Sequence, residues 1–240
     1  MKHLRQLTLT FWLLHLGIPL LFAAVMLWFY PQTNWDIALI SPYFDGTTHS
    51  FYLKNNFLLD GVMHTGVKSV LFLGPILTIA ALLWSIKNLA LRPYRRRLFW
   101  LLAGQFFGAL VVSLLKKISI HACPWDLKMF GGYAPFLPLF ADLPAGMNPG
   151  RCFPGGHASG GFSLLAFYFA LRDDYQRWAN WALVIGLLLG SAMGWAQMMR
   201  GAHFLSHNLW TMWWVWMSLL LLYLVWPPVK DRPVIVAQKD

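Results

Sequence analysis

The chain has 240 residues, of which 58% are hydrophobic and only 12% are charged, and its mean hydropathy is +0.52. These values are typical of an integral membrane protein and unlike those of a soluble domain. The formal net charge is +10, and all nine acidic residues are aspartate. Because no basic soluble segment is long enough to form a binding face, we expect no nucleic-acid partner. The scattered aspartates argue against a carboxylate-rich metal site.

Six apolar segments are each expected to cross the membrane as a helix. The first, residues 7–30, is long enough to span about 30 Å of hydrocarbon. It is too long for a signal-peptide core and has no convincing cleavage site, so we expect it to be retained. The sequence therefore predicts an all-α fold, in which residues 1–240 form a single six-transmembrane-helix bundle. The expected spans are 7–30, 69–86, 98–115, 157–171, 179–199 and 209–226.

Positive charge is divided unequally between the two sides of this predicted bundle. Twelve of the nineteen Lys and Arg residues fall on the side of the termini, five of them in the short loop 87–97. The positive-inside rule then predicts that both termini are cytoplasmic. The long segment 116–156 and the patch 200–207 share the outer face, which in a bacterial inner membrane is the periplasmic face.

The stretch Arg-Cys-Phe-Pro-Gly-Gly-His-Ala-Ser, residues 151–159, runs from a Pro/Gly-rich loop into an apolar helical segment. His157 is expected at a helix N-terminus, where free N–H groups and the helix dipole favour an anion. Gly155 and Gly156 allow close approach of a ligand, and Arg151 carries donors suited to phosphate. A histidine beside a bound anion can protonate a leaving oxygen. The alternative is a glycine-rich helix cap with an incidental histidine.

Two further clusters of ionisable residues fall on the same predicted side. Lys116 and Lys117 end the third span, with His121 shortly after them, and the patch 200–207 joins the last two spans. If this patch is helical, its two histidines, four residues apart, share one face. Cations and histidines at a membrane boundary are costly unless they face a polar cavity or a ligand. We therefore expect the active site at the outer face.

The two cysteines, Cys123 and Cys152, both lie in the predicted outer segment. An oxidising compartment would permit a disulfide between them, which we expect. Closing a loop of about thirty residues would stabilise the fold by roughly 3–4 kcal/mol. Two buried free thiols are the alternative. Two cysteines without a second nearby pair are a weak zinc pattern, and we expect no metal.

The three clusters resemble the three motifs of the type 2 phosphatidic acid phosphatase superfamily, which includes membrane lipid phosphatases. That family reads Lys-x6-Arg-Pro, then Pro-Ser-Gly-His, then Ser-Arg-x5-His-x3-Asp. Here residues 116–124 have the first spacing, Pro-Gly-Gly-His at 154–157 matches the second, and His203 stands at the nucleophile position of the third. The resemblance extends over about residues 69–226 and includes the order of six spans.

Four motif positions depart from the family pattern. Cys123 and Gln197 stand where arginine is expected, Gly155 replaces serine and His207 replaces aspartate. Arg151 and Arg200 lie near the motifs and could replace the lost guanidinium groups in space. The imidazole of His207 can still orient His203, although it carries no fixed negative charge.

The resemblance implies a mechanism that needs neither a metal nor a cofactor. His203 would attack phosphorus and form a phosphohistidine, and His207 would fix its tautomer. His157 would protonate the departing alkoxide and then activate water. The phosphoryl oxygens would be held by Lys116, Arg151, Arg200 and the backbone N–H groups of Gly155 and Gly156.

We therefore expect an integral membrane phosphatase that hydrolyses a lipid phosphate or pyrophosphate, with a phospholipid, an isoprenoid or a lipid A phosphate as substrate. One alternative is a phosphotransferase that passes the phosphate to another lipid. A non-catalytic lipid-phosphate binder or transporter is a second alternative. A haem protein that uses His157 and His203 as axial ligands is a third. Membrane lipids are expected around the chain, and no partner protein is implied.

Overall fold

The computed structural model describes residues 7–229, and the Lys and Arg residues near both termini (Lys2, Arg5, Lys230, Arg232 and Lys239) lie outside that range. The α-helices are α2 (Leu9–Trp12), α3 (Ile18–Trp28), α4 (Trp35–Ile40), α5 (Val67–Leu71), α6 (Leu73–Lys87), α7 (Arg95–Ile118), α8 (Gly156–Phe162), α9 (Leu165–Leu171), α10 (Gln176–Met199) and α11 (Leu205–Val225). The strands β1 (Phe44–Asp45) and β2 (Ser50–Phe51) form a short antiparallel pair. The described chain is therefore mostly helical, as predicted.

Shorter helical segments complete the elements. One π-helix, Leu13–Gly17, joins α2 to α3, and a second, Leu58–Gly66, leads into α5. The 3₁₀ segments are Tyr30–Gln32, Ser41–Tyr43, Leu89–Tyr94, Pro124–Asp126 and Lys128–Phe130.

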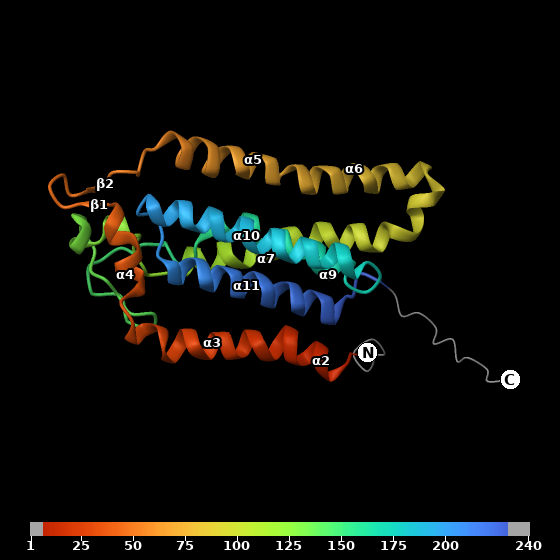
Figure 1. Cartoon of the computed structure of the whole chain (residues 1–240), viewed down its shortest axis with the longest axis horizontal. Helices are drawn as coiled ribbons and strands as arrows, with labels where there is room; N and C mark the ends of the chain where they lie inside the picture. The colour runs from red at the N-terminus through yellow and green to blue at the C-terminus, as the bar shows by residue number, and fades with distance from the viewer. Residues whose placement is uncertain (1–6, 230–240) are drawn as a thin grey trace.

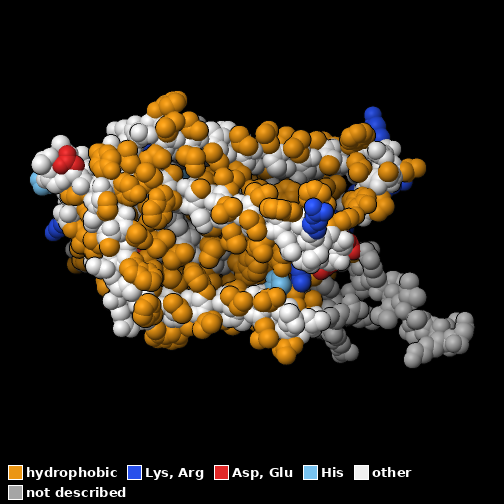
Figure 2. Space-filling model, viewed as in Figure 1, with side chains coloured by type: hydrophobic (Ala, Val, Ile, Leu, Met, Phe, Trp, Pro, Cys, Tyr) orange, Lys and Arg blue, Asp and Glu red, His pale blue; other side chains and the backbone are white. Residues whose placement is uncertain are grey.

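The long helices run side by side in an elongated bundle (Figure 1). The α5–α6 pair forms one edge and α2–α3 the opposite edge, with α7, α10 and α11 between them. The β1–β2 pair, α4 and the long loop before α8 gather at one end of the bundle. Apolar side chains cover the visible flank, whereas charged side chains lie at the two ends (Figure 2). This distribution is the one that a lipid bilayer requires.

Among the described residues, five helical segments are long and apolar enough to cross a membrane: Leu9–Gln32, Ser69–Lys87, Leu89–Ile118, Gln176–Met199 and Leu205–Val225. They correspond to five of the six predicted spans and make the chain a multi-pass membrane protein. The remaining prediction, residues 157–171, is occupied by two short helices, α8 and α9. Neither short helix is long enough to count as a span by itself.

The break between α8 and α9 has a local cause. The Ser163 hydroxyl donates to the Gly160 carbonyl at 2.6 Å, and the Leu164 N–H donates to the Gly161 carbonyl three residues back. Serine hydroxyls that compete for helix carbonyls bend helices, and three-residue bonds tighten the turn. Residues 157–171 are therefore one apolar segment in the sequence but form two helices in the structure.

Small residues bring the central helices close together. Gly104 of α7 faces Leu219 of α11, because a Cβ at position 104 would lie 3.1 Å from Leu219 Cδ2. Large side chains fill the space beside this contact, and Trp100 and Phe169 are fully buried. Close backbone approach is how helices gain contact energy in lipid, where the hydrophobic effect does not drive them together.

A disulfide joins Cys123 to Cys152, with the two Cα atoms 5.1 Å apart. Backbone hydrogen bonds run beside it, since the N–H groups of Arg151 and Cys152 donate to the carbonyls of Ser119 and His121. The segment after α7 is thereby fastened to the segment before α8. This connection holds the residues of the first motif next to those of the second.

Two adjacent glycines of α8 provide a matched test of this packing. A Cβ at Gly161 would lie 2.6 Å from the Cα of Gly190, whereas a Cβ at Gly160 would make only ordinary contacts with side chains. We expect Gly161→Ala to destabilise the protein by about 1–3 kcal/mol, because backbone cannot move aside cheaply. We expect Gly160→Ala to change stability by less than about 1 kcal/mol. Thermal unfolding in detergent measures both, and equal shifts would contradict the close α8–α10 contact.

Candidate active site

The predicted catalytic histidines meet at the end of the bundle that carries the long loop. His203 lies in the link between α10 and α11, and His207 lies in the first turn of α11. Their Nδ1 atoms are 3.3 Å apart, and the two side chains are 1% and 4% exposed. His157, in the first turn of α8, has its ring centroid 5.9 Å from that of His203. The structure thus brings three histidines from distant parts of the sequence together.

Lys116 reaches this cluster from the last turn of α7. A Cβ at Gly156 would lie 3.8 Å from Lys116 Nζ, so the ammonium group lies beside the start of α8. Lys116, Gly156 and His157 line one cavity of about 440 Å³, which continues along the bundle past Phe72 and Phe106. The cavity therefore has a cationic end at Lys116 and His157, and the rest of its lining combines apolar side chains with Gln105 and three serines.

The environment of His203 keeps its imidazole neutral. Burial lowers the pKa of His203 well below its ordinary value, and the neighbouring His207, Lys116 and His157 lower this pKa further, since a second positive charge beside them would be unfavourable. A neutral imidazole has one nitrogen lone pair available for attack. Because Nδ1 faces His207, Nε2 lies on the other side of the ring. His203 thus has the protonation state that a nucleophile requires.

Sulfur is also close to these rings, but it belongs to the disulfide. Cys152 Sγ lies 3.5 Å from His203 Nδ1, and the ligand atoms of Cys152, His203 and His207 fall within 4.8 Å of one another. A thiolate would be needed to complete a metal site of this kind, and the bond to Cys123 removes it. The three residues therefore leave only two histidine nitrogens as ligands.

The loop before α8 is fixed to the start of α11. The Gly155 N–H donates to the His207 carbonyl at 3.2 Å, and the Thr211 hydroxyl donates to the carbonyls of Gly155 and His207 at 3.0 and 2.7 Å. This corrects one expectation, because the Gly155 N–H was predicted to hold a phosphoryl oxygen and instead bonds within the protein. The Gly156 N–H remains a predicted phosphate donor.

Arg200 also differs from its predicted role. Its Nη2 pairs with Asp60 Oδ1 at 2.8 Å, its Nε donates to the Lys54 carbonyl at 2.9 Å, and its Nη1 lies 3.4 Å from Gln197 Oε1. These contacts tie the end of α10 to the π-helix before α5. With all its guanidinium nitrogens engaged in this way, Arg200 is a structural cation. Arg151, by contrast, is exposed and directly precedes Cys152 in the loop before α8.

Asn208 occupies the space that the family's serine would use. A Cβ at Gly155 would lie 2.7 Å from Asn208 Oδ1, and a Cβ at Gly194 would lie 2.7 Å from Asn208 Cγ. The amide is thus held between two glycines, and its Oδ1 and Nδ2 have no hydrogen-bond partner within the described part of the chain. The sequence analysis did not identify Asn208. The available signal was Gly155, because a glycine where the family has serine leaves space that another side chain can fill.

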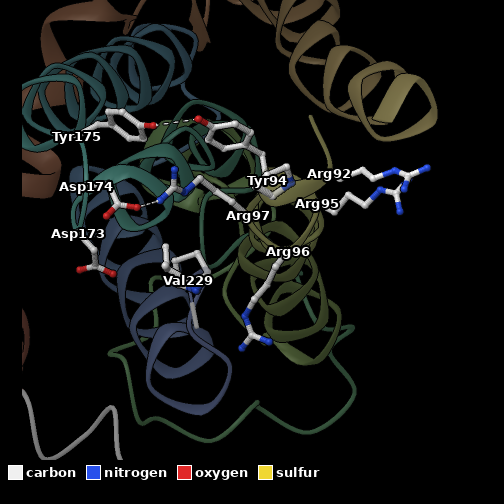
Figure 3. A pocket seen from close by; sticks show the side chains of 11 residues that line it. Arg92, Tyr94, Arg95, Arg96, Arg97, Asp173, Asp174, Tyr175 and Val229 are labelled. Carbon is white, nitrogen blue, oxygen red and sulfur yellow. Dashed lines mark hydrogen bonds and ion pairs between the residues drawn. The ribbon is translucent and has the colours of Figure 1, made fainter. Parts of the chain in front are cut away.

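A second cavity, of about 840 Å³, lies at the opposite end, beside the start of α7. It is lined by four arginines, but they point in different directions (Figure 3). Arg97 forms an ion pair with Asp174, and Arg96 Nε donates to the Pro227 carbonyl at 2.8 Å. Because these cations do not converge on one point, the cavity is not a second phosphate site. Its pairs hold the ends of the helices together.

The fold and the site define a class, a multi-pass helical membrane protein with a buried pair of histidines beside a lysine. The family model described as the PAP2 superfamily matches residues 97–231, which is more than half of the chain. The chain belongs to this superfamily of phosphatase-type enzymes, and its membrane-like helices fit a lipid-phosphate substrate. Comparisons with curated proteins and with solved structures found no match.

Restoring the family's serine tests the role assigned to Asn208. Gly155→Ser should lower phosphatase activity at least about 10-fold, because the new side chain must displace the amide that is wedged against Gly194. Gly155→Ser combined with Asn208→Ala should recover much of the lost activity. Turnover of both variants, with folding checked by size exclusion, measures this. An undisturbed Gly155→Ser enzyme would show that Asn208 does not occupy the serine's space.

Proposed function

We propose that the protein is an integral membrane phosphatase that hydrolyses a lipid phosphate or pyrophosphate through a phosphohistidine on His203. One observation carries this proposal: a neutral, buried His203 is held through Nδ1 by His207, so its Nε2 is left for the reaction. The ring centroid of His157 is 5.9 Å from that of His203, and Lys116 lies beside Gly156 at the start of the same helix as His157. This arrangement supplies a nucleophile, an acid and a phosphate ligand at one place.

In the first step, Nε2 of His203 bonds to phosphorus as the bond from phosphorus to the lipid oxygen breaks. His157 gives its proton to the departing oxygen. In the second step, water attacks the phosphohistidine, His157 takes the water's proton, and His203 is released with free phosphate. Lys116, the Gly156 N–H and Arg151 hold the phosphoryl oxygens, whose charge is largest in the transition state.

The shape of the cavity favours a lipid over a soluble phosphate ester. Its cationic end is lined by Lys116 and His157, and another part of its wall is formed by Phe72, Pro75 and Phe106. A hydrocarbon chain placed against these apolar side chains would bury apolar surface while its phosphate lay beside Lys116 and His157, whose ring centroid is 5.9 Å from that of His203. We propose a phospholipid, isoprenoid or lipid A phosphate as the substrate class.

The catalytic step can be tested with substrates that differ in their leaving group. We expect His203→Ala to abolish turnover and His157→Ala to lower it about 10²–10⁴-fold on a lipid phosphate. A phenolate leaving group needs no protonation and should partly restore His157→Ala but not His203→Ala. Free phosphate from a panel of lipid phosphates in detergent is the measurement. Labelled lipid without free phosphate would indicate phosphotransfer, and full activity of His203→Ala would exclude the phosphohistidine.

We further propose that α8 and α9 together form a sixth crossing, that both termini are cytoplasmic and that the site faces the periplasm of a bacterial inner membrane. The arginines at 92 and 95–97 lie at the end of the bundle opposite the histidines, which supports this orientation. Reporter fusions after Arg97 should behave as cytoplasmic, and fusions near Pro144 as exported. Cytoplasmic behaviour at Pro144 would place the site on the wrong side.

A further inference from the structure

The position of the hydrogen between His203 and His207 decides which group must accept a hydrogen bond from His207. For Nε2 of His203 to keep its lone pair, its Nδ1 must carry the hydrogen and donate it to Nδ1 of His207. His207 is then a neutral imidazole whose hydrogen is on Nε2. That N–H is buried with the rest of the side chain and needs an acceptor.

A small cavity of about 60 Å³ lies beside His207 and is separate from the cavity lined by Lys116 and His157. It is lined by His207, His121, Asp36 and Ser206 together with apolar side chains, among them Phe153 and Phe204. The rings of Phe153 and Phe204 pack edge-on against His207 and cannot accept its proton. A cavity of this size holds at least one water, which needs about 10–15 Å³ and two to four polar partners.

His121 does not provide the acceptor. Its Nε2 lies 3.2 Å from the Pro138 carbonyl, which can only accept, so Nε2 carries the hydrogen. Its Nδ1 lies 3.3 Å from the Ser119 hydroxyl, which already accepts from the His121 N–H and therefore donates to Nδ1. Burial lowers the pKa of His121, which keeps the ring neutral. Both ring nitrogens are thus occupied.

Asp36 offers acceptor capacity together with Ser206. Its Oδ1 accepts from the Tyr30 hydroxyl at 2.7 Å and the Ser206 N–H at 2.8 Å, and its Oδ2 accepts from the Ser206 hydroxyl at 2.5 Å. A carboxylate has about four lone-pair sites, and the backbone N–H of Leu205 also acts on this one. The Ser206 hydroxyl, which donates to Oδ2, keeps its own lone pairs and extends the acceptor surface of Asp36 toward water. Asp36 is the acidic residue that lines this cavity, and it lies in α4, outside the residues matched by the family model.

We propose that Asp36 is a positioning residue for the reaction, linked to His207 Nε2 by water in this cavity, either directly or through the Ser206 hydroxyl. The chain Asp36–water–His207–His203 places a negative charge behind the nucleophile, which the family achieves with an aspartate at the position of His207. The inference rests on the proposed phosphohistidine mechanism. As the bond to phosphorus forms, His203 becomes cationic, and the carboxylate stabilises that charge.

A double-mutant cycle tests this link. In the wild-type background, Asp36→Asn should lower kcat about 10–100-fold with little change in KM, because an amide donates to the water instead of accepting from it. In a His207→Asp background, which places a carboxylate directly against His203, Asp36→Asn should lower kcat less than about 3-fold. Equal losses in the two backgrounds would overturn the link.

Asp36 also accepts hydrogen bonds from Ser206 at the start of α11. A loss of kcat in Asp36→Asn could therefore come from a disturbed helix, and separate control variants are needed. Tyr30→Phe removes one hydrogen bond from the same carboxylate but keeps its charge, and it should change kcat less than about 3-fold. Ala122→Val adds bulk to the cavity without touching the carboxylate, and it should reproduce the loss of kcat by displacing water. If Asp36→Asn does not fold, the kcat of Ala122→Val tests the water link instead.

Two outcomes contradict the proposal at different levels. A wild-type enzyme that releases no phosphate from any lipid in the panel would end the proposed function, and the link with it. An active wild type in which Tyr30→Phe loses as much kcat as Asp36→Asn, or Ala122→Val retains full kcat, would end the link alone. Thermal unfolding of each variant identifies losses that come from folding.

Discussion

The contact between the Nδ1 atoms of His203 and His207 is the interaction on which the histidine end of the bundle depends. Both rings are buried, and the backbone of His207 accepts hydrogen bonds from Gly155 and Thr211. A neutral imidazole is less costly to bury than an ionised carboxylate, which loses its hydration without full compensation. Histidine at this position therefore permits a tighter enclosure of His203 than aspartate would.

Three elements, α7, α8 and α11, must meet before the histidine contact can become a site. The disulfide and the adjacent backbone hydrogen bonds place the end of α7 beside the start of α8, which brings Lys116 to Gly156. Thr211 then fastens that loop to α11. The departures from the family pattern act together, since Gly155 leaves room for Asn208 and Gln197 contacts Arg200. Each of these substituted residues is therefore accommodated by a contact of its own, so the substitutions do not represent a partial loss of the motif.

Hydropathy predicted five of the helices well, because a long apolar run in lipid has few structures open to it. It predicted one continuous helix at residues 157–171, where the structure has two short helices with the Ser163 hydroxyl bonded to the Gly160 carbonyl between them. Motif spacing predicted which histidines meet. Motif spacing also assigned Arg200 to phosphate. It could not predict the ion pair of Arg200 with Asp60 or its bond to the Lys54 carbonyl, because both contacts depend on tertiary structure that the motif does not contain. Asp36 was missed for the same reason, since 170 residues separate it from Ser206.

The central claim, that His203 carries the phosphoryl group, is tested most directly by trapping the intermediate. The enzyme would be quenched in base during turnover of a labelled lipid phosphate, digested, and the phosphorylated peptide sequenced by mass spectrometry. The account predicts an acid-labile phosphoryl group on His203, which accumulates further in His157→Ala with a phenolate leaving group because water is then activated poorly. A phosphoryl group on His157 or His207, or turnover with no phosphoenzyme at any quench time, would contradict it.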